Sequence, residues 1–535
     1  MKSLFLHPRP SAILPPNRYT SADLDPVPFI HRTWAWYNIG GFWISEGFQV
    51  PILQMAGGLV AAGLSPGLAM GAIVLGNFLA MIPCASSGYI GAKFGINYPV
   101  MNRASWGVEG AKLAVALRGI VAVCWFGVQI ATGGACVNTM LTAIWPSLPS
   151  RVPNHLPAGA HTTSLDLLCF FLFWFITLPF LYIHVSKLRW LFFVKMLLMP
   201  ILGLGLFIWS IVHAHGFGPV FSQPTVIHSP GQSIVFVFFT AITSTIGPQA
   251  TFALNMGDFC RYAKSPRGAF ISQFIMMPIC LTLTAFLGVT MASASMVIFR
   301  LDEPQWNPLV VIGMFESRAA QFFIGLLFAL ATLCTNIAGN SVAFGNDLSS
   351  LFPRFINIRR GQFICAILGV IITPWNILNT SGNFLNFLNG YTVFLGPVCG
   401  IMMTDFWILR RRQLNLQQLY QPDGHYSFTK GWNFRAIAAF LLSLTPTLPG
   451  LAASVASSNK VPKGFGDIYT SNWAVGLVLA GGFYCGFSIM WPVSIWNEGD
   501  SDIAKVYLET LGVDSVSQEI KEKDVVVDEL SVGES

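Results

Sequence analysis

Trp125 and Gln129 stand one helical turn apart in the apolar stretch VCWFGVQIATGG (123–134). Side chains four residues apart lie on the same face of a helix, so an indole and an amide share one surface. The indole can stack on a flat ring, and the amide can donate and accept hydrogen bonds at its edge. The pair therefore suits a small, planar, neutral ligand. Packing of the indole in a helix bundle, with the amide bonded to a neighbouring helix, is an equally open interpretation.

A second set of polar side chains lies in ATLCTNIAGN (331–340). Asn336 and Asn340 are four residues apart, and Thr335 and Cys334 directly precede them. Two amides and a hydroxyl could bind a ligand and a small cation. The alternative is that the neighbouring small residues mark close helix packing, with asparagine hydrogen bonds between helices.

Glu46 is the most informative ionisable residue, because it lies inside an apolar run, in ISEGFQVP (44–51). A carboxylate within a membrane span is costly and indicates a functional site by default. Burial favours the protonated form of a carboxyl group, so Glu46 is predicted to load and unload a proton. The alternative is a structural role, either an ion pair with Lys112, Arg118 or Lys195 or a hydrogen bond to the interrupted backbone.

The composition shows what kind of element must position these residues. Only 10% of the 535 residues are charged and 53% are hydrophobic, whereas about a quarter of the residues in a soluble protein are charged. Several apolar runs reach about 20 residues, the length that a helix needs to cross a bilayer, and they lack the short alternating segments of a membrane barrel. The sequence predicts an all-α polytopic membrane protein. Its net charge of +6 must be read by side of the membrane and does not indicate a nucleic-acid partner.

Twelve transmembrane helices are predicted, over residues 35–60, 66–86, 111–143, 164–184, 188–213, 233–257, 269–298, 319–345, 361–378, 384–409, 434–455 and 472–494. The lysines and arginines of the connecting segments divide fifteen to five between the two sides, and the richer side is expected in the cytoplasm. With an even number of spans, both termini are then cytoplasmic. We expect an N-terminal tail over residues 1–33 and a C-terminal tail over residues 497–535.

Two of the predicted spans are interrupted. The first contains residues 44–51, and the sixth contains STIGPQATFALN (244–255), with Gln249 directly after Gly247-Pro248. Freed backbone groups are tolerated within a membrane only where they line a cavity or are buried in protein. Matching interruptions in two halves favour an inverted five-plus-five repeat with a midplane site over two ordinary proline kinks. The expected units are repeat 1 over 34–213, repeat 2 over 233–409, and two further helices over 434–494.

Signals for enzymatic chemistry are weak. No P-loop, dinucleotide-binding glycine pattern or nucleophile elbow occurs in a suitable context. The ten cysteines and nine histidines show no metal-ligand spacing. The sequence therefore predicts a protein that is not an enzyme and holds neither a metal nor a cofactor.

Ordered motifs between about Leu24 and Trp496 resemble the nucleobase–cation symporter family 1, and most of all its fungal uracil/allantoin permease branch. The motifs are RTWAWYNIGGFWISEGF (32–48), CWFGVQ (124–129), NMGDFCRYAKSP (255–266), CTNIAGNS (334–341), GNDLSSLFPRFINIRRG (345–361) and TPWNIL (373–378). The resemblance implies a LeuT-like fold of two inverted five-helix repeats plus two helices, working by alternating access.

The resemblance also implies roles for single residues. Trp125 would stack on a heterocycle, Gln129 would bond its edge, and Asn340 would bond it from the opposite helix, with Asn336 a weaker contact. Leu388 and Tyr391 match an outer gate. Gln249 stands where relatives often carry an aromatic residue, so it could add a hydrogen bond and alter which ring is accepted.

In bacterial relatives a sodium ion lies between the first and eighth spans. The matching positions here are Ser45, Phe48, Ala331, Cys334 and Thr335. Cys334 replaces a hydroxyl and Glu46 introduces a carboxylate, so the resemblance favours H+ over Na+ as the coupling ion.

We therefore expect a plasma-membrane proton symporter for uracil, allantoin or a related heterocycle. Thiamine or a nucleoside such as uridine or nicotinamide riboside is an alternative substrate, and a nutrient receptor that does not transport is an alternative function. The expected partners are the heterocycle and the lipid bilayer. Lys521 and Lys523 could in addition serve ubiquitin-dependent trafficking.

Overall fold

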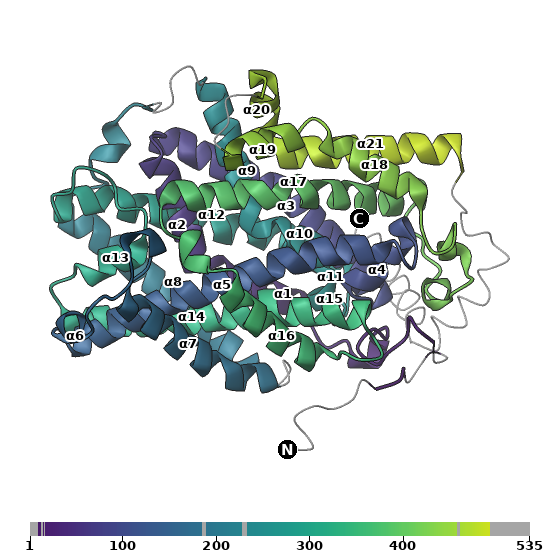
Figure 1. Ribbon diagram of the computed structural model, residues 1–535, viewed down its shortest axis with the longest axis horizontal. Helices are drawn as coiled ribbons and strands as arrows, with labels where there is room; N and C mark the ends of the chain where they lie inside the picture. The colour runs from purple at the N-terminus through teal and green to yellow at the C-terminus, as the bar shows by residue number, and fades with distance from the viewer. Residues whose placement is uncertain are drawn as a thin grey trace, which may run out of the picture.

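The computed structural model of the protein describes residues 9–11, 14, 17–183, 189–226, 233–456 and 461–492. These residues are almost entirely helical, and their β-pairing is limited to isolated bridges. Figure 1 shows long helices lying side by side along the long axis of the molecule. The N-terminal segment gathers at one end with α4 (Tyr98–Trp106), and we call this the N-terminal end; α6 (Leu148–Arg151) and α13 (Pro308–Gly313) lie at the opposite end.

The first half of the chain contains the helices expected of repeat 1. They are α1 (Trp36–Gly47), α2 (Val50–Ala61), α3 (Pro66–Phe94), α5 (Ala111–Ile144), α7 (Ser164–Tyr182) and α8 (Arg189–His213). The first predicted span is divided as expected. Gln49 has an extended backbone (φ −146°, ψ 151°) between α1 and α2, and Pro51 can start α2 because the first helical turn has no use for its missing N–H.

The second half repeats this order. Its helices are α9 (Ile234–Ala250), α10 (Phe252–Asn255), α11 (Gly257–Cys260), α12 (Pro266–Ile298), α14 (Arg318–Thr335), the π-helix η5 (Asn336–Val342), α15 (Ala343–Leu351), α16 (Ile358–Ile371), α17 (Ser381–Met403) and the π-helix η7 (Thr404–Leu409). The sixth predicted span bends by 45°, but α9 continues through Pro248 and the bend falls at Thr251.

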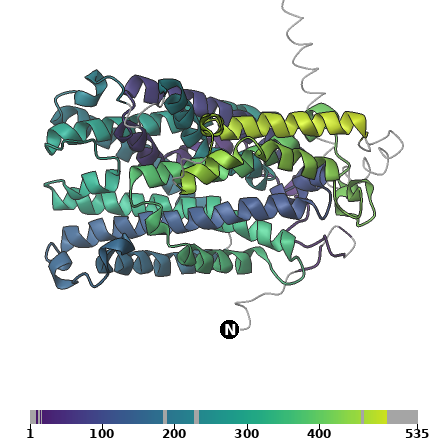
Figure 2. The same ribbon diagram turned by 45° about the horizontal axis from the view of Figure 1, so that its top comes forward.

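The chain is completed by α18 (Phe434–Leu444), α19 (Leu448–Ala456), α20 (Lys463–Tyr469) and α21 (Asn472–Met490). In Figure 2 these yellow-green helices lie along one side of the bundle. Among the described residues, eight helices are long and apolar enough to cross a membrane, or ten if each bent pair forms one span. The predicted count of twelve is therefore not confirmed, partly because α1 and α2 are twelve-residue halves.

The N-terminal end is packed more closely than the predicted span boundaries indicate. The predicted second span ends at residue 86, but α3 continues to Phe94, and α4 buries Arg103 to 2% exposure. Within the predicted N-terminal tail, the described residues include a packed part, since Leu24 is fully buried and Tyr19 is 3% exposed. The guanidinium of Arg103 donates to the backbone oxygens of Leu419 and Tyr19. Polar contacts between segments distant in sequence, which leave no local pattern, fix this end.

Two apolar cores meet at α5. Trp125 belongs to the core built mainly from α1–α4, α9–α12 and α17–α21, whereas Phe126 belongs to the core of α7, α8 and α14–α16. A helix that packs on both sides presents successive residues to different neighbours. This double packing is what fixes the direction in which Trp125 and Gln129 point.

Candidate functional site

Trp125 lies against the residues predicted to form the outer gate. Its indole Nε1 donates a hydrogen bond to the hydroxyl of Tyr391 over 3.1 Å. Its ring contacts those of Phe387 and Phe384 edge-on, at centroid distances of 5.5 and 6.4 Å. Trp125 is 5% exposed. The structure thus brings the predicted stacking residue and the predicted gate into direct contact.

Gln129 is joined to the interruption in the first span. Its Nε2 donates to Oε1 of Gln49 over 2.9 Å, and its own Oε1 is buried without a hydrogen-bond partner in the described structure. A buried amide oxygen without a partner costs free energy, which a ligand N–H could recover. Sequence reasoning missed Gln49 as a site residue. The signal was present, because the polar Gln49 stands within the interrupted stretch.

Asn336 and Asn340 lie in the π-helix η5, a conformation that often marks functional sites. Nδ2 of Asn340 donates to Oδ1 of Asn336 over 3.0 Å, and Nδ2 of Asn336 donates to the backbone oxygen of Phe126 over 3.3 Å. Phe126 directly follows Trp125. The eighth span is therefore hydrogen-bonded to the third at the height of the predicted stacking residue. We call Gln49, Trp125, Gln129, Asn336 and Asn340 the central site.

Gln249 and Leu388 lie around the sixth span. Gln249 is buried in the last turn of α9, and its Oε1 has no hydrogen-bond partner among the described residues. The described contacts do not join it to Trp125 or Gln129, so its role stays a prediction. Leu388 packs on Gly247, where an added Cβ would come within 2.9 Å of the leucine Cβ. The predicted gate therefore touches the sixth span as well as Trp125.

Aromatic rings also close the site toward the N-terminal end. Phe42 and Trp43 of α1 contact Phe252, with centroid distances of 5.9 and 5.7 Å, and Phe259 lies 4.8 Å from Phe42. We call these four residues the inner aromatic cluster. Phe42 and Trp43 stand seven and six residues before Gln49, about 10 Å nearer the N-terminal end along the axis of α1. Sequence analysis did not single them out, because aromatic residues are common in every span.

Glu46 forms the ion pair that was its alternative interpretation. Its Oε1 lies 3.3 Å from Nζ of Lys195, and the side chains of both residues are almost fully buried. Nζ of Lys195 also donates to the hydroxyl of Thr335, whereas Oε2 of Glu46 has no hydrogen-bond partner in the described structure. We call Glu46 and Lys195 the coupling pair. The other two candidate cations are engaged elsewhere, Arg118 with Asp347 and Lys112 with Glu109.

Lys195 stands among the positions predicted for a cation. Thr335 accepts its hydrogen bond, and the neighbouring Cys334 thiol lies 3.8 Å from the backbone oxygen of Leu191. The hydroxyl of Ser45 is buried without a partner in the described structure. The remaining two predicted positions carry apolar side chains. Ala331 is fully buried, and Phe48 packs on Gly203. No group of three or more His, Cys, Asp or Glu among the described residues could hold a metal ion.

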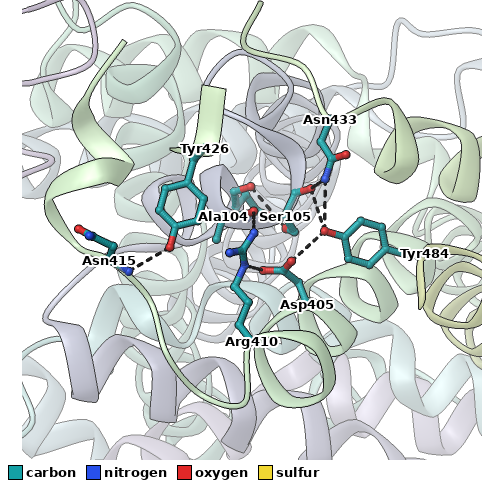
Figure 3. Close-up of polar contacts among 9 residues, drawn as sticks. Ala104, Ser105, Asp405, Arg410, Asn415, Tyr426, Asn433 and Tyr484 are labelled. Atoms are coloured by element: carbon teal, nitrogen blue, oxygen red, sulfur yellow. Dashed lines mark hydrogen bonds and ion pairs between the residues drawn. The ribbon is translucent and has the colours of Figure 1, made fainter. Parts of the chain in front are cut away.

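Another buried ion pair lies at the N-terminal end, where η7 ends (Figure 3). Nε of Arg410 donates to Oδ2 of Asp405 over 2.8 Å, and the hydroxyl of Tyr484 donates to Oδ1 over 2.8 Å. Nη2 of Arg410 donates to the backbone oxygen of Ala104, and Nδ2 of Asn433 donates to the hydroxyl of Tyr484. We call these residues the end network. It joins α4, η7, the start of α18 and α21.

The sequence and the fold were compared with known proteins. Residues 26–476 match the family described as permeases for cytosine/purines, uracil, thiamine and allantoin. The chain is 32% identical to the uracil permease of Saccharomyces cerevisiae, over 88% of this chain and 76% of that protein. It is also 32% identical to the allantoin permease of Bacillus subtilis, over 88% of this chain and 93% of that protein.

A solved structure supports the fold. The match is to Mhp1, a nucleobase-cation-symport-1 family transporter in a closed conformation with bromovinylhydantoin bound. The TM-score is 0.70 at 22% identity, and the match covers 93% of this chain and 100% of that one. At this level of identity the likeness shows the fold alone. The predicted fold class of a LeuT-like polytopic helical bundle is confirmed.

Proposed function

Because the chain belongs to the family of permeases for cytosine/purines, uracil, thiamine and allantoin, we propose that it carries uracil, allantoin or a related small planar heterocycle across a membrane. Transport is secondary, works by alternating access without catalysis, and is coupled to protons. The observation that supports this proposal most is the central site. There Gln129 of the third span is hydrogen-bonded to Gln49 of the first. Asn340 bonds Asn336, which bonds the backbone of the third span at the residue after Trp125.

The two sets of aromatic rings suggest how access alternates. Trp125 is held by the hydroxyl of Tyr391, part of the predicted outer gate, and the inner aromatic cluster lies toward the N-terminal end. Outward opening would require the bond between Trp125 and Tyr391 to break, whereas inward opening would require α1 and α10 to separate at Phe42 and Phe252. Stacking on Trp125 would contribute about 1–3 kcal/mol per ring.

The coupling pair supports protons as the driving ion. An ammonium group already occupies the space among the predicted cation positions, so Na+ would meet a like charge there. Glu46 and Lys195 can both change protonation state, and neutralising either one releases the contact between α1 and α8. Proton uptake from outside would thereby be linked to movement of the first span. We place the protein in the plasma membrane with both termini in the cytoplasm; Lys521 and Lys523 lie outside the described residues.

The test is uptake of labelled uracil by cells that express the full chain, with competition by allantoin, thiamine, uridine and nicotinamide riboside. We expect saturable accumulation that dissipating the proton gradient abolishes and removing Na+ does not. Trp125→Ala should lower apparent affinity about tenfold or more, the loss of one stacked ring. The matched control is Trp145→Ala, at the end of the same helix, where the side chain is 52% exposed.

Each result decides between stated alternatives. Preferential competition by thiamine or a nucleoside would replace the proposed substrate within the same mechanism. Binding without accumulation would indicate a receptor. Normal affinity in Trp125→Ala at normal surface abundance would overturn the central site.

A further inference from the structure

An apolar crevice of about 290 Å³ opens between α5 and α16, with α15 behind it. Figure 1 shows these helices side by side. Its lining is apolar except for Asp347 and includes Ala116 and Ile120 of α5, Leu351 of α15 and Ile371 of α16. The one charged residue, Asp347, is ion-paired with Arg118, so the crevice carries no uncompensated charge. We call it the lateral crevice.

The lateral crevice faces outward from the bundle. Ile371 and Ile120 at its mouth are 67% and 63% exposed. Ile120 belongs to a helix long and apolar enough to cross a membrane, and Ile371 lies in the predicted ninth span. Within α5, Ile120 and the terminal Ile144 are the two exposed residues. Apart from its terminal residue, α5 is thus exposed only at the lateral crevice, where surrounding lipid would reach the helix that carries Trp125 and Gln129.

The lateral crevice opens beside a point where α5 and α16 pack closely. α5 and α16 meet at Gly127, where an added Cβ would come within 2.5 Å of the backbone oxygen of Gly369. Nearer the N-terminal end the lining comes from α5 and α15, and α16 contributes only its last turn. The crevice extends along α5 from Val115 to Cys124, about 13 Å at the rise of an α-helix. One leaflet of hydrocarbon is about 15 Å deep, so the length suits one acyl chain.

The segment next to the crevice carries positive charge. Leu351, which lines the crevice, is followed by Phe352 and Phe355, which are 51% and 69% exposed, with the exposed Arg354 between them. Exposed aromatic and basic residues together are typical of a surface that lies at lipid headgroups. Arg359 and Arg360 follow within the first turn of α16.

Acidic residues are few around this segment in the part of the chain that the structure describes. Asp347 is the one acidic residue between Phe344 and Ile372. Asp23 of the N-terminal segment accepts a hydrogen bond from the backbone N–H of Ile358. Among the described residues, three guanidinium groups against the carboxylate of Asp23 leave this segment positive. The cytoplasmic leaflet is rich in anionic lipid, and the orientation proposed above places the segment on that side.

We propose that the lateral crevice binds one anionic phospholipid. One acyl chain fills the crevice against α5 and α15, and the phosphate lies against Arg354 and its neighbouring arginines. An empty apolar crevice would forfeit dispersion contacts on its walls, and the arginines select the headgroup. Because α15 continues directly from η5, the bound chain contacts helices that carry both the indole and the asparagines of the central site. The lipid would accordingly stabilise one arrangement of the third and eighth spans.

The test is native mass spectrometry of the purified full chain with added phosphatidylserine or phosphatidylcholine of identical acyl chains. We expect one phosphatidylserine to be retained preferentially. Ile120→Trp should reduce retention about tenfold by filling the mouth. The matched control is Ile201→Trp, which is 63% exposed on α8 and lies outside the crevice. Ala116→Phe, which fills the interior of the crevice, provides a second variant.

The charge contribution is tested separately. Arg354→Gln should weaken phosphatidylserine retention about fivefold, the factor for one basic residue at an anionic surface, and Arg151→Gln at the opposite end should not. Equal retention of the two lipids by the unaltered protein would overturn the proposal. So would unchanged retention in monodisperse Ile120→Trp or Ala116→Phe. Because lipid retention is measured without transport, failure here would leave the proposed transport function standing.

Discussion

The coupling pair and the end network are both buried carboxylate–cation pairs, yet their surroundings differ. Asp405 and Arg410 are 2.8 Å apart, and both oxygens of the carboxylate receive a hydrogen bond. Glu46 and Lys195 are 3.3 Å apart, and one oxygen of Glu46 has no hydrogen-bond partner in the described structure. A fully satisfied pair resists neutralisation, whereas an incompletely satisfied pair is closer in free energy to its neutral form.

Their positions in the fold match this difference. The end network joins α4, η7, α18 and α21 by hydrogen bonds at the N-terminal end. The coupling pair joins the interrupted first span to the fifth and eighth. One pair therefore holds a fixed end together, and the other lies between parts that must move during transport.

The largest effect is expected in the end network. Asp405→Asn leaves Arg410 buried without its counter-charge, which should cost about 3–5 kcal/mol of stability. Thermal unfolding of the detergent-purified protein would measure it. The pH dependence of any remaining transport should be unchanged, and a changed pH dependence would contradict a purely structural role.

Breaking the coupling pair should lower the free energy of unfolding by less than breaking the end network, and it should abolish accumulation of substrate. Lys195→Met leaves Glu46 free to neutralise itself by taking a proton, so the stability loss should stay below that of Asp405→Asn when both are unfolded under the same conditions. Accumulation against a gradient should be lost. Lys195→Arg sharpens the comparison, because a guanidinium keeps the charge but does not deprotonate. If Lys195→Arg still accumulated substrate normally, deprotonation of Lys195 would have no part in coupling.

Glu46→Gln should leave substrate binding intact while removing the coupling of transport to protons. Because the amide cannot ionise, uptake should no longer rise as the external pH is lowered, although substrate should still exchange across the membrane. Uptake and counterflow at several external pH values would measure both properties. An unchanged pH profile would exclude Glu46 as the proton carrier.

A single hydrogen bond of the end network gives a smaller effect. Tyr484→Phe removes the donor to Asp405 and should cost about 1.5–3 kcal/mol, the range for hydrogen bonds to charged groups. The measurement is again thermal unfolding, with Tyr37→Phe as the control because Tyr37 is 61% exposed. Equal stability of the two variants would mean that Asp405 is held by Arg410 alone.

The smallest effect is expected at the partly exposed Glu109. Burial raises the pKa of this carboxyl, but hydrogen bonds from Lys112 and Tyr19 and the charges of Lys112 and Arg18 outweigh burial and lower it below 4.5. A lowered folded-state pKa gives stability that is present above pH 4.5 and is lost as the pH falls through the folded-state pKa. Glu109→Gln should cost no more than about 1 kcal/mol at neutral pH. Protease cleavage of the N-terminal segment would report the loss.

Sequence reasoning succeeded for features that repeat locally. The apolar runs predicted the long helices, and the polar and proline-containing interruptions predicted the breaks in the first and sixth spans. It failed where partners come from distant segments. Glu46 had three candidate cations, and nothing local distinguished Lys195, which is 149 residues away. Gln49 was seen as an interruption and not as a partner of Gln129, since hydrogen bonds between helices leave no periodic signal.

By itself the sequence determined that the chain is a helical membrane protein with two interrupted spans. It also determined that an indole and an amide share one helix face. Both conclusions follow from hydropathy and helical period, which are properties of neighbouring residues. Only the tertiary structure decided that the Trp125 indole meets Tyr391 and that the Lys195 ammonium lies among the predicted cation positions. It also decided that the described part of the N-terminal segment around Leu24 is packed. Those outcomes depend on which helices lie against one another. The packing of two apolar cores around α5 sets that arrangement.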